Sequence, residues 1–428
     1  MNPPRSARNT LWIAACVALG LALRLSFALL YWTDQPLTHD EREYLALARS
    51  VARGEGFRYP ADEPTPGTGQ QFGRAPGYPL FLAAIIEPSP VSQAPRRIQI
   101  AQAMLGAAGI WLIAAIAGRA AGPRAAVTAA ALAAIYPPLI WMPSYVLSET
   151  LFSTLALTAA LALQEKGDRS HFADKKGPVP FSEKWRFSKK GPVPFFGGGL
   201  TGIAILVRPV TLFFLPLVTL WMVRKNAYRA AAIFVITAIL CVLPWTIRNY
   251  LVYGRWIAVA SEGGVTFWTG NHPLAKGDGD LSTNVDLKRA ELAFRAAHPG
   301  LTPEQMEPVY YQATLRWIRS DPAAWLALVA RKAYYTVMPF GPSYAVHSSR
   351  YRVASAASFL LILPAAIYGA WRWREARRAG TSPAPLWLMA AATVAAGLVF
   401  FPQERFRMPV IDPALIVTAA LPAGLRKR

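Results

Sequence analysis

The sequence has little cysteine and little acid. Among its 428 residues are only 2 cysteines, Cys16 and Cys241, and both lie inside apolar stretches. They imply neither a disulfide framework nor a thiolate metal site. Charged residues make up only 16% of the chain, and the 24 acidic residues are far outnumbered by 45 Lys and Arg. So low a charged fraction excludes an ordinary soluble protein of this length.

Signatures of nucleotide and metal binding are also missing. The glycine run 197–199 precedes an apolar helix and has neither the spacing nor the lysine of a nucleotide-phosphate loop. The 5 histidines are scattered, and no cluster of His, Cys or Asp has metal-ligand spacing. His39 beside Asp40 is the one candidate for a weak ligand or a proton partner. We therefore predict no certain cofactor, and a divalent metal is neither indicated nor excluded.

Long apolar runs are what the chain has in abundance. Apolar residues make up 54% of it, in runs of about 20, the length that crosses a hydrocarbon core of about 30 Å. We predict an all-α polytopic membrane protein with about ten transmembrane helices. The predicted spans are 11–31, 97–117, 125–143, 146–164, two short helices within 197–223, 229–247, 353–371, 385–401 and 408–424.

We predict that the first span is retained and that proline interrupts two later ones. The first run is too long for the apolar part of a signal peptide and lacks a clear cleavage site, so we expect a retained helix. Proline cannot continue the hydrogen-bond ladder of a helix. We therefore predict one break at Arg208-Pro209 and another at Pro244-Trp245.

The basic residues orient the chain. The formal net charge of +21 lies largely in short loops between apolar runs, which is typical of membrane proteins and argues against nucleic acid as the partner. Arg5 and Arg8 place the N-terminus in the cytoplasm and the loop 32–95 outside. We expect a multi-pass protein of the plasma (inner) membrane whose active site faces the periplasm or exterior.

The chain divides into three predicted parts. Residues 1–249 form a transmembrane catalytic module, with amphipathic juxtamembrane helices in its external loop. This module includes a disordered cytoplasmic insert at 165–195, where Lys-Lys-Gly-Pro-Val-Pro-Phe occurs twice. Residues 250–352 form an external, periplasmic segment of mixed structure, in which 322–338 is an interfacial amphipathic helix. Residues 353–428 form the C-terminal transmembrane helices.

Polar groups that suit chemistry gather on the predicted outer face. The carboxylates are Asp40, Glu41 and Glu149. Arginines occur there too, although the charge rule predicts few on that side. They are Arg74, Arg208, Arg248, Arg405 and Arg407. A substrate with a phosphate in the headgroup plane and an apolar tail fits this surface, because arginines bind the phosphate and helices bind the tail. A carboxylate beside them can act as a base toward a hydroxyl.

The order of these motifs resembles the GT-C superfamily of integral-membrane glycosyltransferases. These enzymes use polyprenyl-phosphate sugars, and they include protein O-mannosyltransferases and the aminoarabinose transferase acting on lipid A. The resemblance covers most of the chain, and the insert at 165–195 departs from it. Its motifs are Asp40-Glu41-Arg42-Glu43-Tyr44, Arg74-Ala75-Pro76-Gly77-Tyr78-Pro79, Leu147-Ser148-Glu149, Leu206-Val207-Arg208-Pro209, Pro244-Trp245-Thr246-Ile247-Arg248-Asn249, Gly270-Asn271 and Glu404-Arg405-Phe406-Arg407-Met408-Pro409.

The resemblance implies roles for the matching residues. Asp40 would be the catalytic base, Glu41 would assist it by hydrogen bonding, and Arg74 would contact the lipid phosphate. We add Arg405, Arg407, Arg208 and Arg248 as further candidate phosphate ligands. Candidates for acceptor binding or for support of the site are Glu149, Tyr44 and Asn271. No residue is assigned to a metal.

The implied reaction is an inverting transfer of a hexosyl or pentosyl group from polyprenyl phosphate to a hydroxyl of an envelope lipid, glycan or protein. Two other classes stay open. A transporter or lipid flippase also has broken helices and intramembrane arginines such as Arg24, but no repeat relates the two halves of this chain. A structural subunit of an envelope complex would use 250–352 for docking. The sequence selects no particular sugar, acceptor or oligomeric state.

Overall fold

The computed structural model describes residues 5–33, 35–59, 73–86, 93–164, 193–279, 283–339, 341, 348–375 and 382–425. Within these ranges all regular secondary structure is helical, so the predicted all-α class is confirmed there. Most of the predicted insert, 165–192, lies outside the described residues. Its last three residues belong to a helix that begins at Val193, so the prediction of disorder is wrong for them.

Four helices of the described chain are long and apolar enough to cross a membrane. A fifth candidate is bent by 66° around Tyr136, where Pro137 and Pro138 interrupt the ladder. The four are α1 (Arg5–Ser26) with its π-helical end η1 (Phe27–Tyr31), α4 (Arg96–Ala121), α10 (Tyr228–Tyr253) and α15 (Ser349–Glu375). The bent pair is α5 (Pro123–Ile135) with α6 (Pro137–Trp141) and the turn η2 (Met142–Ser144).

Shorter apolar helices complete the bundle. They are α7 (Glu149–Leu163), α8 (Val193–Val207), η4 (Pro209–Phe213) leading into α9 (Phe214–Val223), α16 (Ala384–Val399), and α18 (Ile411–Ala420) with η6 (Leu421–Ala423). The predicted number of about ten spans is not confirmed, because these helices are too short to count as crossings by length alone. The predicted break at Arg208 is confirmed, since its backbone is extended (φ −142°, ψ 110°) between α8 and η4.

The predicted break at Pro244 is wrong. Helix α10 continues past it to Tyr253 and ends at Gly254, which adopts the left-handed conformation with φ 65°. Membrane helices tolerate an internal proline where neighbouring groups compensate. Beyond the proline, the side chains of Trp245 and Thr246 also anchor the helix to the segment after it, each donating a 2.8 Å hydrogen bond to a backbone carbonyl.

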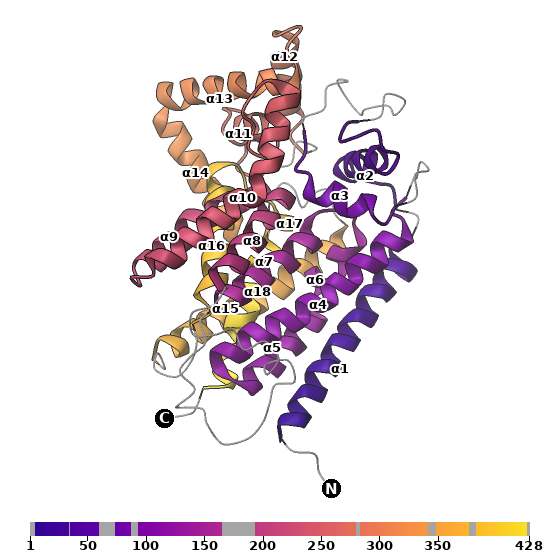
Figure 1. The fold of residues 1–428 in the computed structure, drawn as a ribbon, viewed down its shortest axis with the longest axis vertical. Coiled ribbons are helices and arrows are strands. Elements are labelled where there is room, and N and C mark those ends of the chain that lie inside the picture. Colours follow the sequence, from indigo (N-terminus) through magenta and orange to yellow (C-terminus); the bar gives the residue numbers. More distant parts are fainter. Residues whose placement is uncertain are drawn as a thin grey trace.

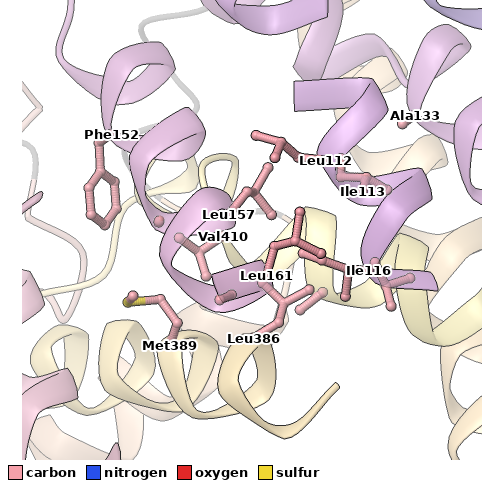
Figure 2. Packing of buried hydrophobic residues seen from close by; sticks show 14 of the residues in the cluster. Leu112, Ile113, Ile116, Ala133, Phe152, Leu157, Leu161, Leu386, Met389 and Val410 are labelled. Carbon is pink, nitrogen blue, oxygen red and sulfur yellow. The ribbon is translucent and has the colours of Figure 1, made fainter. Parts of the chain in front are cut away.

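Helix α7 lies at the centre of the hydrophobic core. Figure 2 shows Leu157 and Leu161 of α7 between side chains of α4, such as Ile116, and of α16, such as Leu386 and Met389. On the other side of α4, α5 packs closely through a row of fully buried alanines, which let helix backbones approach. Because α7 is fixed on both sides, its first residue, Glu149, has a defined position.

The remaining helices form a layer at one end of the bundle. Helix α1 begins at the lower end in Figure 1, and the layer lies at the opposite end. It contains α2 (His39–Ala52), α3 (Gly77–Ala83), α11 (Gly263–Gly270), α12 (Val285–Ala296) and α13 (Pro303–Ser320), while α14 (Pro322–Val337) returns toward the bundle and α17 (Glu404–Arg407) lies between α16 and α18.

This layer corrects the predicted mixed structure of 250–352. Its described residues form helices joined by loops, without a strand. Trp268 of α11 and Met306 and Tyr310 of α13 are buried in a small hydrophobic core of their own, which gives each helix an apolar face to cover.

Candidate functional site

Helix α2 presents the acidic motif in a fixed orientation. Thr38 caps it, with its side chain accepting from the Glu41 backbone while Glu41 Oε2 accepts from Thr38 N at 2.8 Å. Carboxylates are stabilised in this first turn by the helix dipole. Residues three apart share a face of a helix, so Asp40 and Glu43 point the same way and Glu41 points elsewhere.

Arg74 joins that face of α2. Its Nη2 donates to Asp40 Oδ1 at 2.8 Å, and its Nε donates to Glu43 Oε2 at 2.8 Å. The ring of Tyr44 lies 5.4 Å from the guanidinium carbon. His39, the candidate proton partner of Asp40, instead lies against Glu43, with Nε2 3.3 Å from Oε1.

Arg74 also contacts the segment that leads into α11. Its Nη1 lies 3.0 Å from Oε2 of Glu262, the residue before α11. Two backbone-anchored hydrogen bonds hold the segments together: Gly73 N donates to Ser261 Oγ at 2.7 Å, and Ser261 N donates to Gly73 O at 2.9 Å. This double contact places the guanidinium group beside the Glu262 carboxylate.

Arg405 holds the other side of Asp40. Its Nη2 lies 2.7 Å from Asp40 Oδ2, and its Nε lies 4.0 Å from Glu149 Oε1. Its Nε also donates to Gln403 Oε1 at 2.9 Å. Each oxygen of Asp40 therefore faces its own guanidinium group, one from the first loop and one from α17.

Arg208 is the third arginine that contacts these carboxylates. Its Nη1 lies 2.8 Å from Glu149 Oε1, and its guanidinium carbon lies 4.9 Å from the ring centre of Phe406. The guanidinium carbon of Arg405 lies 5.2 Å from the same ring. We call the following residues the arginine–carboxylate cluster: Asp40, Glu43, Arg74, Glu149, Arg208, Glu262 and Arg405.

The cluster is open at one end and closed at the other. The side chains of Asp40 and Arg405 are 21% and 36% exposed, whereas Glu149 is only 4% exposed. Burial alone would raise the pKa of Asp40, but the charges of Arg405 and Arg74 outweigh it and hold that pKa well below its ordinary value. Glu262 differs, because burial raises its pKa and Arg74 offsets this only in part.

Two predicted site residues face away from the cluster. Glu41 is buried, and its second oxygen, Oε1, accepts from Val146 N at 2.7 Å. Both carboxylate oxygens thus accept hydrogen bonds from backbone N–H groups, one of Thr38 and one of Val146. Glu41 therefore positions the start of α2. Arg407 faces the bundle interior, with Nε 2.8 Å from Asp412 Oδ1 and its guanidinium carbon 4.0 Å from the Phe359 ring centre. An ion pair so buried is built into the fold, not offered to a ligand.

Two other predicted site residues lie outside the cluster. Arg248 donates to the Phe57 carbonyl at 3.2 Å, and with Trp245 and Tyr253 it lines a small hollow that Arg74 also lines. Asn271 lies farther off.

Asn271 is a structural link between elements. Its amide donates to Val399 O at 2.8 Å, and its Oδ1 accepts from Lys332 Nζ at 2.8 Å and Trp325 Nε1 at 3.0 Å. These contacts tie α11 and α14 to the end of α16. Asn271 therefore supports the segment that carries Arg405 and does not itself enter the cluster.

Sequence reasoning missed two members of the cluster. Glu43 belongs to the quoted motif, and its spacing of three from Asp40 was the signal that could have assigned it a role. Glu262 has no comparable local signal, because only the Gly73–Ser261 contact brings it to Arg74. Among the described residues, no group of three or more His, Cys, Asp or Glu is arranged to hold a metal ion.

Comparison with known proteins supports the fold alone. No family model and no curated protein matches the sequence. The oligosaccharyltransferase of Archaeoglobus fulgidus, solved with a tethered acceptor peptide, is 13% identical at a TM-score of 0.52, over 96% of this chain and 49% of that one. Its apo form is 15% identical at a TM-score of 0.52, over 96% and 50%.

This chain thus spans about half the length of the oligosaccharyltransferase. ArnT of Cupriavidus metallidurans bound to undecaprenyl phosphate aligns over 98% of this chain and 78% of its own, at 14% identity, but its TM-score of 0.37 is too low to support an argument. The helical fold of this chain is therefore similar to that of the Archaeoglobus fulgidus oligosaccharyltransferase.

Proposed function

We propose that the protein is a membrane glycosyltransferase. It moves a sugar from a polyprenyl-phosphate donor to a hydroxyl of an envelope lipid, glycan or protein, on the non-cytoplasmic face of the inner membrane. One observation carries this proposal: Asp40 lies between Arg74 and Arg405 at the end of an apolar helical bundle, with one guanidinium group on each oxygen. The fold shared with an oligosaccharyltransferase supports it.

The arginines suit the donor phosphate. Guanidinium groups bind phosphate through paired, charge-assisted hydrogen bonds. Arg74 and Arg405 are partly exposed at the open end of the cluster, while the neighbouring bundle offers apolar surface for the prenyl tail. Arg208 lies against Glu149 and adds positive charge beside them. Arg248 borders the same region through the hollow beside Arg74.

Asp40 is the base in this proposal. The acceptor oxygen forms a bond to the anomeric carbon of the sugar as the bond from that carbon to the phosphate oxygen breaks. The hydroxyl proton passes to Asp40, and the electron pair of the broken bond stays on the leaving polyprenyl phosphate. Arg74 and Arg405 stabilise the charge that develops on the phosphate. A single displacement of this kind inverts the anomeric configuration.

Incubation of the purified full chain with a radiolabelled polyprenyl-phosphate sugar and cell-envelope lipids tests the proposal. Transfer of label to an acceptor in wild type, lost in Asp40→Asn and kept in Asp286→Asn, supports it. Asp286 is a suitable match because it lies exposed on α12. Movement of intact labelled lipid between leaflets without transfer would reject the enzyme in favour of a flippase.

A further inference from the structure

Arg74 and Arg405, which we assign to the donor phosphate, already contact carboxylates in this structure. All three nitrogens of the Arg74 guanidinium group contact carboxylates: Nη2 contacts Asp40, Nε contacts Glu43, and Nη1 contacts Glu262. Arg405 contacts Asp40 through Nη2. A phosphate cannot bind Arg74 through two of its nitrogens, the usual paired mode, unless some of these contacts are given up.

The carboxylates differ in how easily they can be displaced. Glu43 and Glu149 are 8% and 4% exposed, so separating either from its arginine would leave a buried charge uncompensated. Asp40 and Glu262 are 21% and 31% exposed, and water can solvate them once they are released. The exchangeable partners of the arginines are therefore Asp40 and Glu262, at the open end of the cluster.

Asp40 is a weak base while it stays in this arrangement. Two guanidinium groups stabilise its ionised form, and they hold its pKa well below the ordinary value for an aspartate. A base with so low a proton affinity accepts a proton from a hydroxyl poorly. In this arrangement Asp40 is held in ion pairs with the arginines and is poorly suited to act as a base.

We propose that the donor phosphate and Asp40 compete for the guanidinium groups of Arg74 and Arg405, so that binding of the donor releases Asp40 to act as the base. This inference rests on the proposed function. It makes catalysis ordered: the acceptor hydroxyl is activated only after the donor phosphate has replaced Asp40 on the arginines. Without a donor, the ion pairs keep the site neutralised and inactive.

Competition and mere orientation of the arginines by Asp40 predict opposite effects of Asp40→Asn on phosphate binding. If Asp40 only oriented the arginines, Asp40→Asn would weaken phosphate binding. If it competes, Asp40→Asn removes the competitor and strengthens binding. We expect farnesyl phosphate, which carries no sugar, to bind this variant about tenfold more tightly than wild type, the scale of one charge-assisted hydrogen bond. Glu262→Gln should tighten binding by a smaller factor, since it releases Arg74 alone.

Isothermal titration of farnesyl phosphate into the full chain in detergent micelles measures the affinity of each variant. Farnesol is the ligand that has the tail without the phosphate, and Asp286→Asn is the matched control variant. Tighter binding in Asp40→Asn with wild-type affinity in Asp286→Asn supports competition. Unchanged or weaker binding in Asp40→Asn overturns it while leaving the proposed function intact.

If wild type binds farnesyl phosphate no better than farnesol, the proposed function fails and the competition fails with it. If Asp40→Asn does not fold, as judged by its melting curve, Glu262→Gln decides the question. Tighter binding in that variant supports competition, and equal or weaker binding rejects it.

Discussion

Two groups of buried charge in this molecule are built in opposite ways. On α12, Glu291 is 1% exposed and takes its partners mainly from its own helix, with Oε2 3.3 Å from Lys288 Nζ and Oε1 paired with Arg295. Tyr310 of α13 donates to it at 3.0 Å. The arginine–carboxylate cluster instead draws its members from segments distributed along most of the chain, and its outer edge is open to solvent.

This difference separates a structural role for the α12 set from the ligand-binding role that we propose for the arginine–carboxylate cluster. Pairs at i,i+3 and i,i+4 form as soon as their helix forms, and a closed set of them stabilises that helix and its packing. Gathering charges from distant segments costs desolvation that the ion pairs recover only in part. In our proposal, the three arginines at this partly exposed point bind an anion once Asp40 is displaced, and the closed α12 set offers no such exchange.

The largest expected effect is on Asp40. We expect Asp40→Asn to lower the rate of sugar transfer by about 10²–10⁴-fold, because an amide of the same shape cannot take up the acceptor proton. The melting temperature in detergent should stay close to that of wild type, since the change is isosteric and water can solvate the partly exposed Arg405. Radiolabel transfer and thermal melting measure the two quantities. A wild-type transfer rate in this variant would remove Asp40 as the base.

Arg405→Lys tests the open end of the cluster. Lysine keeps the charge but lacks the planar fork that contacts Asp40 here and that would bind a phosphate through two nitrogens. We expect kcat/KM for the donor to fall by about 10–100-fold, through the loss of one or two charge-assisted hydrogen bonds. Arg407→Lys is the control: its ion pair with Asp412 is buried, so it should lower stability and leave the donor KM unchanged. Equal KM effects in both variants would contradict this division.

Glu291→Gln tests the closed set. Arg295 and Lys288 then lose their charged partner, and we expect the free energy of unfolding to fall by about 1–3 kcal/mol. The transfer rate per folded molecule should not change. Denaturant unfolding in detergent and the transfer assay measure the two effects. A slower rate with unaltered stability would show that the α12 set takes part in function.

The smallest expected effect concerns pH. Glu307 is partly buried near Glu304 and Glu262, and this burial and repulsion raise its pKa from 4.5 to about 7. The folded state therefore binds the proton more tightly than the unfolded state, so the stability that Glu307 contributes falls as pH rises from 4.5 to 7. Glu307→Gln should flatten the decline of the melting temperature across that window. An identical pH profile in the variant would show that Glu307 titrates normally.

Local patterns predicted much of the backbone structure around the candidate site. The acidic motif begins a helix because Thr38 and Glu41 form a capping box, and the break at Arg208 follows from the proline after it. The sequence-based predictions failed where tertiary packing sets the course of a helix or the direction of a side chain. Pro244 suggested a break, yet α10 continues through it, and Arg407 looked like a phosphate ligand beside Arg405 but turns inward to Asp412. A sequence does not say which way a side chain faces in a four-residue helix such as α17.

The sequence by itself determined the helical class, the apolar bundle and the residues available for chemistry, because apolar run length, proline and capping act over a few neighbouring residues. Tertiary structure alone decided which charges meet. The double contact between Gly73 and Ser261 brings Glu262 to Arg74, and the packing of α7 and α17 brings Glu149 to Arg405. Ion pairs depend on distances of a few ångströms between segments far apart in the chain, and the packing of the whole bundle sets those distances.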